Sequence, residues 1–137
     1  MRKVFADTGY WVALLNPRDE LHQKVQEVSE AITPVHIFTS EMVLTEVLND
    51  FSKRGNFFRQ AVIELIENIY KHPNVTVVKQ TSSQFQEGLF LYKQRVDKQW
   101  SLTDCVSFQI MEYYNILEAL AYDKHFEQAG FIALLRN

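Results

Sequence analysis

Apolar residues along the chain alternate between short continuous runs and a helical spacing. The short runs, such as Val4-Phe5-Ala6 and the β-branched run at 75–78, are typical of strands. The run at 35–39 combines β-branched and aromatic residues in the same way. Strands are expected at residues 4–6, 35–39, 75–78, 116–122 and 130–134.

Between these runs, apolar side chains recur at every third or fourth residue, as they do in amphipathic helices. Leu21, Val25 and Val28 form one such series, which Pro34 ends. Ser40 is a favourable N-cap for the next helix, because its hydroxyl can accept a hydrogen bond from a free backbone N–H. Helices are expected at residues 21–32, 42–51, 57–70, 83–95 and 103–114, with a short helical turn at 123–128.

This alternation of strands and helices predicts βαβ units. We therefore expect an α/β fold with three layers, in which helices cover both faces of a five-stranded, mainly parallel sheet. One domain over residues 1–137 accommodates all the elements, since domains commonly have 100–200 residues. Right-handed crossovers bring the carboxyl ends of the strands to one edge, where open α/β sheets bind ligands.

Composition narrows the class of protein. Apolar residues make up 47% of the 137 residues and charged residues 23%, which excludes a disordered tail or a fibrous repeat. No stretch approaches 18 uninterrupted apolar residues, so no membrane segment is expected. Cys105 is the one cysteine, so an internal disulfide is impossible and a reduced, cytoplasmic protein is expected. The net charge of −3 argues against a strongly basic nucleic-acid coat, but it permits local binding of a polyanion.

Four acidic residues fall at the predicted ligand-binding edge. Asp7 and Asp123 directly follow the first and fourth strands, Glu46 lies in the second turn of the helix after the second strand, and Asp104 opens a later helix. Two carboxylates ~4 Å apart repel by about 4 kcal/mol at an effective dielectric constant near 20. Oxygen ligands without paired His or Cys suit Mg²⁺ or Mn²⁺ better than zinc. A site for one or two such ions is expected.

Each acid also has a purely structural interpretation. Asp7 and Asp123 stand where a turn or an N-cap is common, and Glu46 lies at the edge of an apolar helix face. Asp104 forms a capping-box pattern with Ser101, but its helix is apolar nearly all round and supplies no Lys or Arg. A buried carboxylate needs a partner, and a metal ion is the natural candidate.

Four motifs in order resemble the PIN-domain family. They are the segments at 4–16, 39–46, 100–105 and 120–131. Small PIN domains are mostly VapC-like toxins of toxin–antitoxin pairs, which are metal-dependent ribonucleases that usually dimerise. The resemblance implies an RNA substrate, a small antitoxin protein and a homodimer for this chain.

The resemblance also places the acidic quartet of the family on residues of this sequence. Those positions are Asp7, Glu46, Asp104 and Asp123, with Thr8 and Thr103 at the neighbouring hydroxyl positions. Cys105 departs from the small residue that relatives often have, which we expect to alter packing rather than metal binding. Two further acids, Glu41 and Asp50, lie near the second motif, and it stays open whether one of them assists the quartet. Among the histidines, only His125 lies close to a predicted ligand.

The implied activity is hydrolysis of RNA phosphodiester bonds by water that a bound ion activates. Asp7 and Asp104 are the expected primary ligands, with Glu46 and Asp123 holding a second ion or its waters. Thr8 or Thr103 is expected to orient a water molecule or a phosphate oxygen. Basic residues with Trp100 before the Asp104 helix can bind substrate, with a solvated face and a packed core residue as the alternatives. These substrate-binding candidates are Lys93, Arg95, Lys98 and Trp100.

Two other classes of protein also place acids at this edge of an α/β sheet. Receiver domains and haloacid-dehalogenase-like phosphatases place acids at strand ends, but Asp7-Thr8-Gly9 lacks the second acid that both require after the first strand. A PIN-fold module that binds RNA or protein without cutting is the remaining alternative. The apolar pair Phe57-Phe58 is expected to contribute to a homodimer or antitoxin interface.

Overall fold

A computed structural model describes residues 1–137 and has a central five-stranded sheet. All neighbouring strands are parallel, in the order β3-β2-β1-β4-β5. The strands are β1 (Arg2–Ala6), β2 (Val35–Ser40), β3 (Val75–Val78), β4 (Glu118–Leu120) and β5 (Ile132–Ala133). The expected α/β fold with a five-stranded parallel sheet is confirmed.

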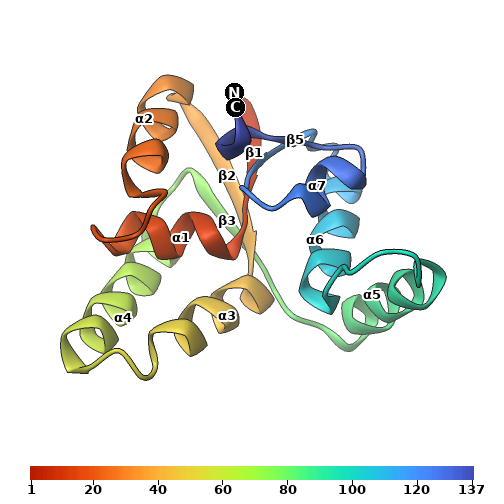
Figure 1. Ribbon diagram of the computed structural model, residues 1–137, viewed down its shortest axis with the longest axis horizontal. Helices are drawn as coiled ribbons and strands as arrows, with labels where there is room; N and C mark the ends of the chain where they lie inside the picture. Colours follow the sequence, from red (N-terminus) through yellow and green to blue (C-terminus); the bar gives the residue numbers. More distant parts are fainter.

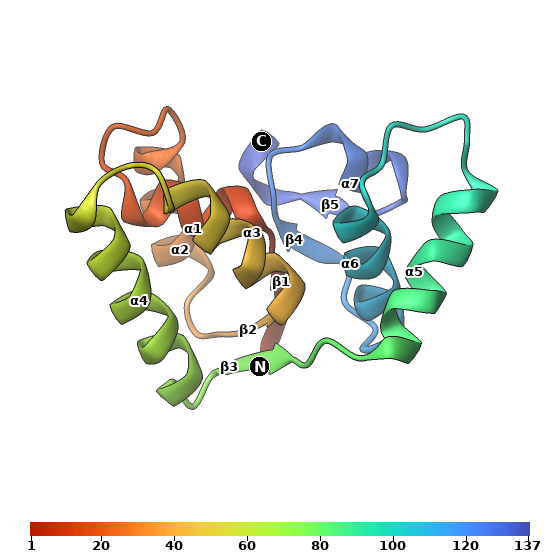
Figure 2. The same ribbon diagram turned by 90° about the horizontal axis from the view of Figure 1, so that it is seen from below.

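Helices cover both faces of this sheet and complete the three layers. The first four helices lie to one side of the sheet and the last three to the other (Figure 1, Figure 2). They are α1 (Thr8–Leu15), α2 (His22–Ile32), α3 (Glu41–Phe51), α4 (Asn56–Lys71), α5 (Ser82–Gln94), α6 (Leu102–Tyr113) and α7 (Lys124–Gln128), followed by the 3₁₀ turn η1 (Leu134–Arg136). None of these helices combines the length and the hydropathy that a membrane-spanning segment requires.

Helix α1 is the one helix that the apolar pattern did not predict. Its sequence, Thr-Gly-Tyr-Trp-Val-Ala-Leu-Leu, is apolar on nearly every side, and Tyr10 to Ala13 are buried. A helix that is apolar all round has no polar face, so it shows no helical period. The strand predictions at 116–122 and 130–134 are too long for a related reason: apolar residues next to β4 and β5 enter the core without pairing in the sheet.

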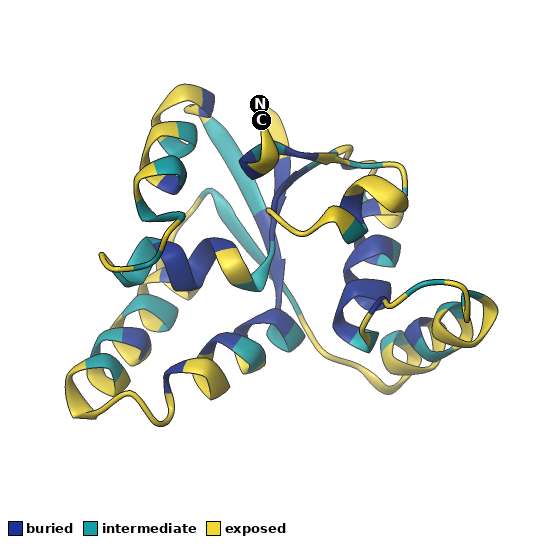
Figure 3. Ribbon diagram, viewed as in Figure 1, coloured by how far each residue is buried: buried dark blue, intermediate teal, exposed yellow.

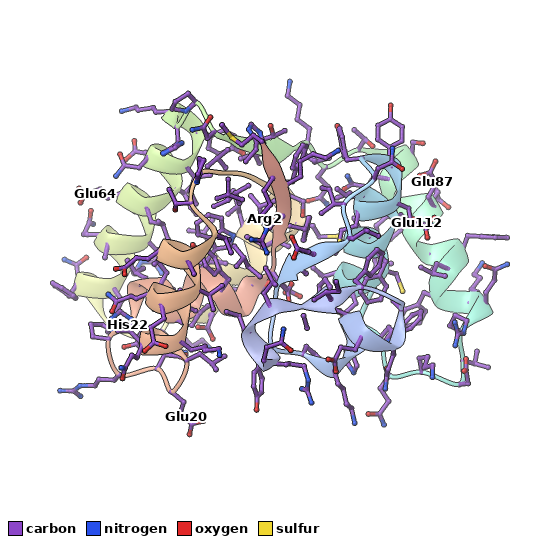
Figure 4. All side chains as sticks on the ribbon, turned by 90° about the horizontal axis from the view of Figure 1, so that it is seen from above. Arg2, Glu20, His22, Glu64, Glu87 and Glu112 are labelled. Atoms are coloured by element: carbon purple, nitrogen blue, oxygen red, sulfur yellow. The ribbon has the colours of Figure 1, made fainter.

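The core surrounds the central strand. Val4, Phe5 and Ala6 of β1 have no exposed surface, and α6 is buried along most of its length (Figure 3). At the amino end of the sheet, Arg2 forms two hydrogen bonds of 2.8 Å with the carboxylate of Glu118, which ties β1 to β4 there (Figure 4). The opposite, carboxyl end of these two strands carries the acidic residues.

Candidate active site

The carboxyl ends of β1 and β4 lie side by side and define one edge of the site. Ala6 is opposite Leu120 in the sheet, and the backbone N–H of Asp7 donates to the carbonyl of Leu120 at 3.2 Å. Asp7 and Asp123 therefore leave the sheet at neighbouring points. This placement follows from the parallel order of the strands.

All four predicted acids line one cavity of about 650 Å³ at this edge. Asp7 and Glu46 come from the α1 and α3 side, while Asp104 and Asp123 come from the α6 and α7 side, on the other face of the sheet (Figure 2). The remaining lining residues are Thr8, Gly9, Leu21, Gln99, Ser101, Tyr122, Lys124, His125 and Arg136.

Asp7 carries the largest electrostatic cost in the site. It precedes α1 as its N-cap residue, but its carboxylate makes no capping hydrogen bond. Its pKa is raised to about 7, chiefly by burial and also by the negative charges of Asp104, Glu46 and Asp123, against a lowering by the backbone N–H of Thr8. The carboxylate of Asp7 is thus close enough to the other three acids to feel their charge, and no cationic side chain is paired with it.

Glu46 is positioned by the neighbouring helix. The hydroxyl of Thr8 donates to the Oε1 atom of Glu46 at 2.6 Å, which joins the start of α1 to the second turn of α3. Ser40 caps α3 by accepting a hydrogen bond from Val43 at 3.1 Å, as its place before the helix predicted. The Thr8 hydroxyl therefore orients a carboxylate in this structure.

Asp104 has the partner that its sequence predicted, Ser101, and a second partner, His125, that sequence analysis did not find. The capping box with Ser101 is formed in both directions, each bond being 3.0 Å long. His125 of α7 places Nδ1 2.9 Å from the same Oδ2 atom that accepts from Ser101. Burial raises the pKa of Asp104, while the Ser101 and His125 contacts lower it. Asp104 therefore has a partner on a different helix, in addition to any metal ion that it binds.

His125 also contacts the second acid on this side. Its Nδ1 atom lies 3.3 Å from Oδ2 of Asp123, and its backbone N–H donates to Oδ1 of Asp123 at 3.0 Å. One ligand atom from each of Asp104, Asp123 and His125 lies within 4.8 Å of the others. The spacing of Asp123 and His125 across an N-cap was the signal in the sequence that could have assigned His125 to the site.

Comparisons with known proteins agree with this arrangement. A family model described as the PIN domain matches residues 4–132. The chain belongs to the PIN domain family. It is 29% identical over 130 residues to the 23S rRNA-specific endonuclease VapC20 of Mycobacterium tuberculosis, from strains CDC 1551 / Oshkosh and ATCC 25618 / H37Rv, with 94% of this chain and 95% of that protein covered.

A solved structure supports the same assignment. The crystal structure of Mycobacterium tuberculosis VapC20, described as a Sarcin-Ricin loop cleaving toxin, superposes with a TM-score of 0.83. The two chains are 26% identical in sequence, and the match covers 94% of this chain and 96% of that chain. The order of strands and helices described above is therefore that of a PIN domain.

The substrate-binding residues expected before α6 do not line the cavity of this PIN domain. Trp100 is only 6% exposed, and its Nε1 donates to Gln128 at 3.0 Å, so its ring is not available to stack on a base. Arg95 covers the Trp100 ring and forms two 3.0 Å bonds with Asp97, and Lys98 approaches Asp97 at 3.9 Å. None of the four substrate-binding candidates lines the cavity. These are Lys93, Arg95, Lys98 and Trp100.

Other candidates also lie outside the cavity. Thr103 is buried in α6 and does not line it. Glu41 accepts hydrogen bonds from Gln80 and Tyr70, and Asp50 pairs with Arg54 at 2.8 Å, so both acids have structural roles elsewhere. The cationic residues that do line the cavity, which sequence analysis missed, are Lys124 and Arg136.

The donor set of the cavity fits a divalent cation. Carboxylate oxygens from four separate elements face one space, and one of these carboxylates has its pKa raised by burial and by the others. A cation relieves that cost, because it favours the charged form of each acid. Asp7 and Glu46 on one side, and Asp104 and Asp123 on the other, are the residues that can hold it.

Proposed function

We propose that this PIN domain is a metal-dependent endoribonuclease that hydrolyses phosphodiester bonds in RNA. The observation that carries the proposal is the convergence of Asp7, Glu46, Asp104 and Asp123 on one cavity at the carboxyl edge of the sheet. The relatives named above support it, since VapC20 is a 23S rRNA-specific endonuclease. Residues 1–137 would act as one domain.

Mg²⁺ or Mn²⁺ is the proposed cofactor, because the acids offer only oxygen atoms. Asp7 and Asp104 would be the primary ligands, and Glu46 and Asp123 would hold a second ion or its water molecules. When bound, such an ion lowers the pKa of a water ligand and offsets the charge that develops on the phosphate.

The side chains of the protein hold this arrangement in place. Thr8 keeps the Glu46 carboxylate directed by its 2.6 Å hydrogen bond, and His125 holds Asp104 and Asp123 toward each other. Partners of this kind orient metal-binding carboxylates and fix their conformations. Lys124 and Arg136 supply positive charge beside the acids, so that a phosphate can approach a site that is otherwise anionic.

The biological role that fits this activity is that of a cytoplasmic toxin with a small antitoxin partner. The support is the similarity to VapC20, whose structure is that of a toxin. A homodimer or antitoxin interface would include Phe57, which is 79% exposed. Phe58 is partly buried, with its ring centre 5.3 Å from that of Phe51, so Phe57 is the residue of the pair that is available to an interface.

Cleavage of RNA under controlled metal conditions tests the activity. Purified protein should cut an RNA that contains single-stranded loops in the presence of Mg²⁺ or Mn²⁺, and EDTA should stop the reaction. Asp7→Asn should lose this activity, while Glu64→Gln, which changes an exposed acid of α4, should keep it. Binding of RNA without any cleavage, in every metal tested, would favour a non-cleaving RNA-binding module.

A further inference from the structure

One rim of the acidic cavity combines an aromatic ring with positive charge. Tyr122, Lys124 and Arg136 all line the cavity, and they come from the segment that follows β4, from α7 and from η1. Tyr122 is the one Phe, Tyr or Trp among the lining residues, and it directly precedes Asp123. It is 53% exposed, in contrast to the buried Trp100.

Arg136 fixes the position of Tyr122. Its Nη1 atom donates to the backbone carbonyl of Tyr122 at 2.9 Å, and its guanidinium lies 5.3 Å from the centre of the Tyr122 ring. Glu127 holds the same guanidinium through Nε at 3.0 Å. The ring therefore has a cation against it, while about half of the residue stays exposed, so an aromatic surface is accessible at the rim of the cavity.

The charges around the cavity favour the approach of a polyanion from the side of Tyr122. Four carboxylates repel phosphates from most of the rim, and positive charge is found beside Tyr122. Lys124 is exposed and forms no ion pair or side-chain hydrogen bond, so its ammonium group is free to bind a phosphate. Arg136 is partly neutralised by Glu127, which leaves Lys124 as the stronger phosphate contact.

We propose that Tyr122 stacks on an unpaired base next to the phosphate that is cut, and that Lys124 binds a phosphate of the same nucleotide strand. Every base has a π face, so a single aromatic side chain favours unpaired nucleotides without selecting a sequence. A base within a duplex is covered on both faces and cannot use this surface. The inference rests on the proposed function and assigns the nucleotide contacts beside the cut to Tyr122 and Lys124.

Binding of RNA without cleavage measures the role of Tyr122 directly. The variants are made in an Asp7→Asn background with Mg²⁺ present, and the probe is an unstructured RNA oligonucleotide with 2-aminopurine at successive positions. Tyr122→Ala and Tyr122→Leu should weaken binding by roughly 5- to 100-fold and should remove the 2-aminopurine quenching at one position. Tyr122→Phe and Tyr122→Trp should retain both the affinity and the quenching.

Lys124→Ala separates the phosphate contact from the stacking contact. It should reduce the slope of log affinity against log salt concentration by about 0.7, as expected for one phosphate contact on a single strand. Tyr122→Ala should leave that slope unchanged. Tyr113→Ala is the matched control, because Tyr113 is 80% exposed and does not line the cavity.

The same substitutions are also made in protein that retains Asp7, and RNA cleavage is measured. This assay distinguishes a failure of the stacking role of Tyr122 from a failure of the proposed function. If the protein cuts RNA and Tyr122→Ala cuts and binds as Tyr113→Ala does, the stacking role is overturned and the proposed function stands. An equal loss in Tyr122→Phe, which keeps the ring, would also overturn it. If the unsubstituted protein cuts no RNA with Mg²⁺ or Mn²⁺, the proposed function fails and the inference fails with it.

Discussion

The two sides of the cavity satisfy their carboxylates in different ways. On the α6 and α7 side, Asp104 and Asp123 receive hydrogen bonds from backbone amides, and both are in contact with His125. On the α1 and α3 side, Glu46 has one hydroxyl partner and Asp7 has no side-chain partner, while the pKa of Asp7 rises to about 7. The protein thus supplies partners for the carboxylates on the α6 and α7 side, and it leaves Asp7 on the other side without a positively charged partner.

This difference indicates where a divalent ion contributes most. A carboxylate that is buried near other negative charges is costly in its ionised form, and a bound cation removes that cost. Asp7 should therefore govern the response of the protein to metal, while the α6 and α7 side should keep its geometry in metal-free protein. Experiments that treat the two sides separately test this division.

The largest expected effect is on cleavage. Asp7→Asn should reduce metal-dependent RNA cleavage to background with the fold intact, because the amide keeps the shape of the side chain and removes the charge that attracts the ion. Asp104→Asn should do the same in a gel-based cleavage assay with circular dichroism as the check on folding. Wild-type rates in both variants would remove the cavity from consideration as the active site.

The response of stability to metal comes next. A ligand that binds only the folded state at a hundredfold excess over its dissociation constant adds about 2.7 kcal/mol to the free energy of unfolding. Mn²⁺ should therefore raise the melting temperature of the unsubstituted protein, and Asp7→Asn should lose most of the rise. Glu64→Gln serves as the control and should respond as the unsubstituted protein does. A similar rise in Asp7→Asn would show that the α6 and α7 side alone binds the ion.

The pH dependence of the metal-free protein should carry the signature of Asp7. Its pKa is about 7 in the folded protein and ~3.9 when unfolded, so the folded state binds more protons between these values. The free energy of unfolding should therefore contain a component that is present below pH ~4 and is lost as the pH rises toward 7. Asp7→Asn should remove this loss and stabilise the metal-free protein at neutral pH by roughly 1–3 kcal/mol.

Urea denaturation of both proteins in EDTA, at pH 4.5 and pH 7.5, measures that component. The difference between the variant and the parent should be small at the lower pH and should grow at the higher one. A constant difference at both pH values would show that burial of Asp7 does not set its protonation.

The smallest effect is expected from the cap on the supported side. Ser101→Ala removes the hydroxyl that accepts from the Asp104 backbone, which should cost about 1 kcal/mol of the free energy of unfolding. Thr81→Ala removes an equivalent cap of α5 far from the cavity, and should cost a similar amount. If Ser101→Ala abolishes the stabilisation by Mn²⁺ and Thr81→Ala does not, the α6 and α7 side contributes to metal binding as much as Asp7 does. The expected division between the two sides would then be wrong.

The local pattern of apolar residues predicted the architecture of this protein, apart from helix α1 and the lengths of β4 and β5. The strands at 35–39 and 75–78 and the helices after them are visible in the spacing of apolar residues, since periods of two and 3.6 residues are properties of the local backbone. Parallel order follows from that alternation, and it places Asp7 and Asp123 at one edge before any contact is known. Helix α1 was not predicted, because a segment that is apolar on nearly every side shows no helical period of apolar residues.

Only the tertiary structure decided how the acids are partnered and which cations face them. His125 reaches Asp104 across 21 positions of sequence, and Arg136 reaches Tyr122 across 14, so neither contact leaves a local signal. Trp100 precedes the Asp104 helix in the sequence, yet packing against Phe108 turns it into the core. Sequence spacing places a residue near an edge of the sheet, but the direction of its side chain depends on neighbours that the chain brings together by folding.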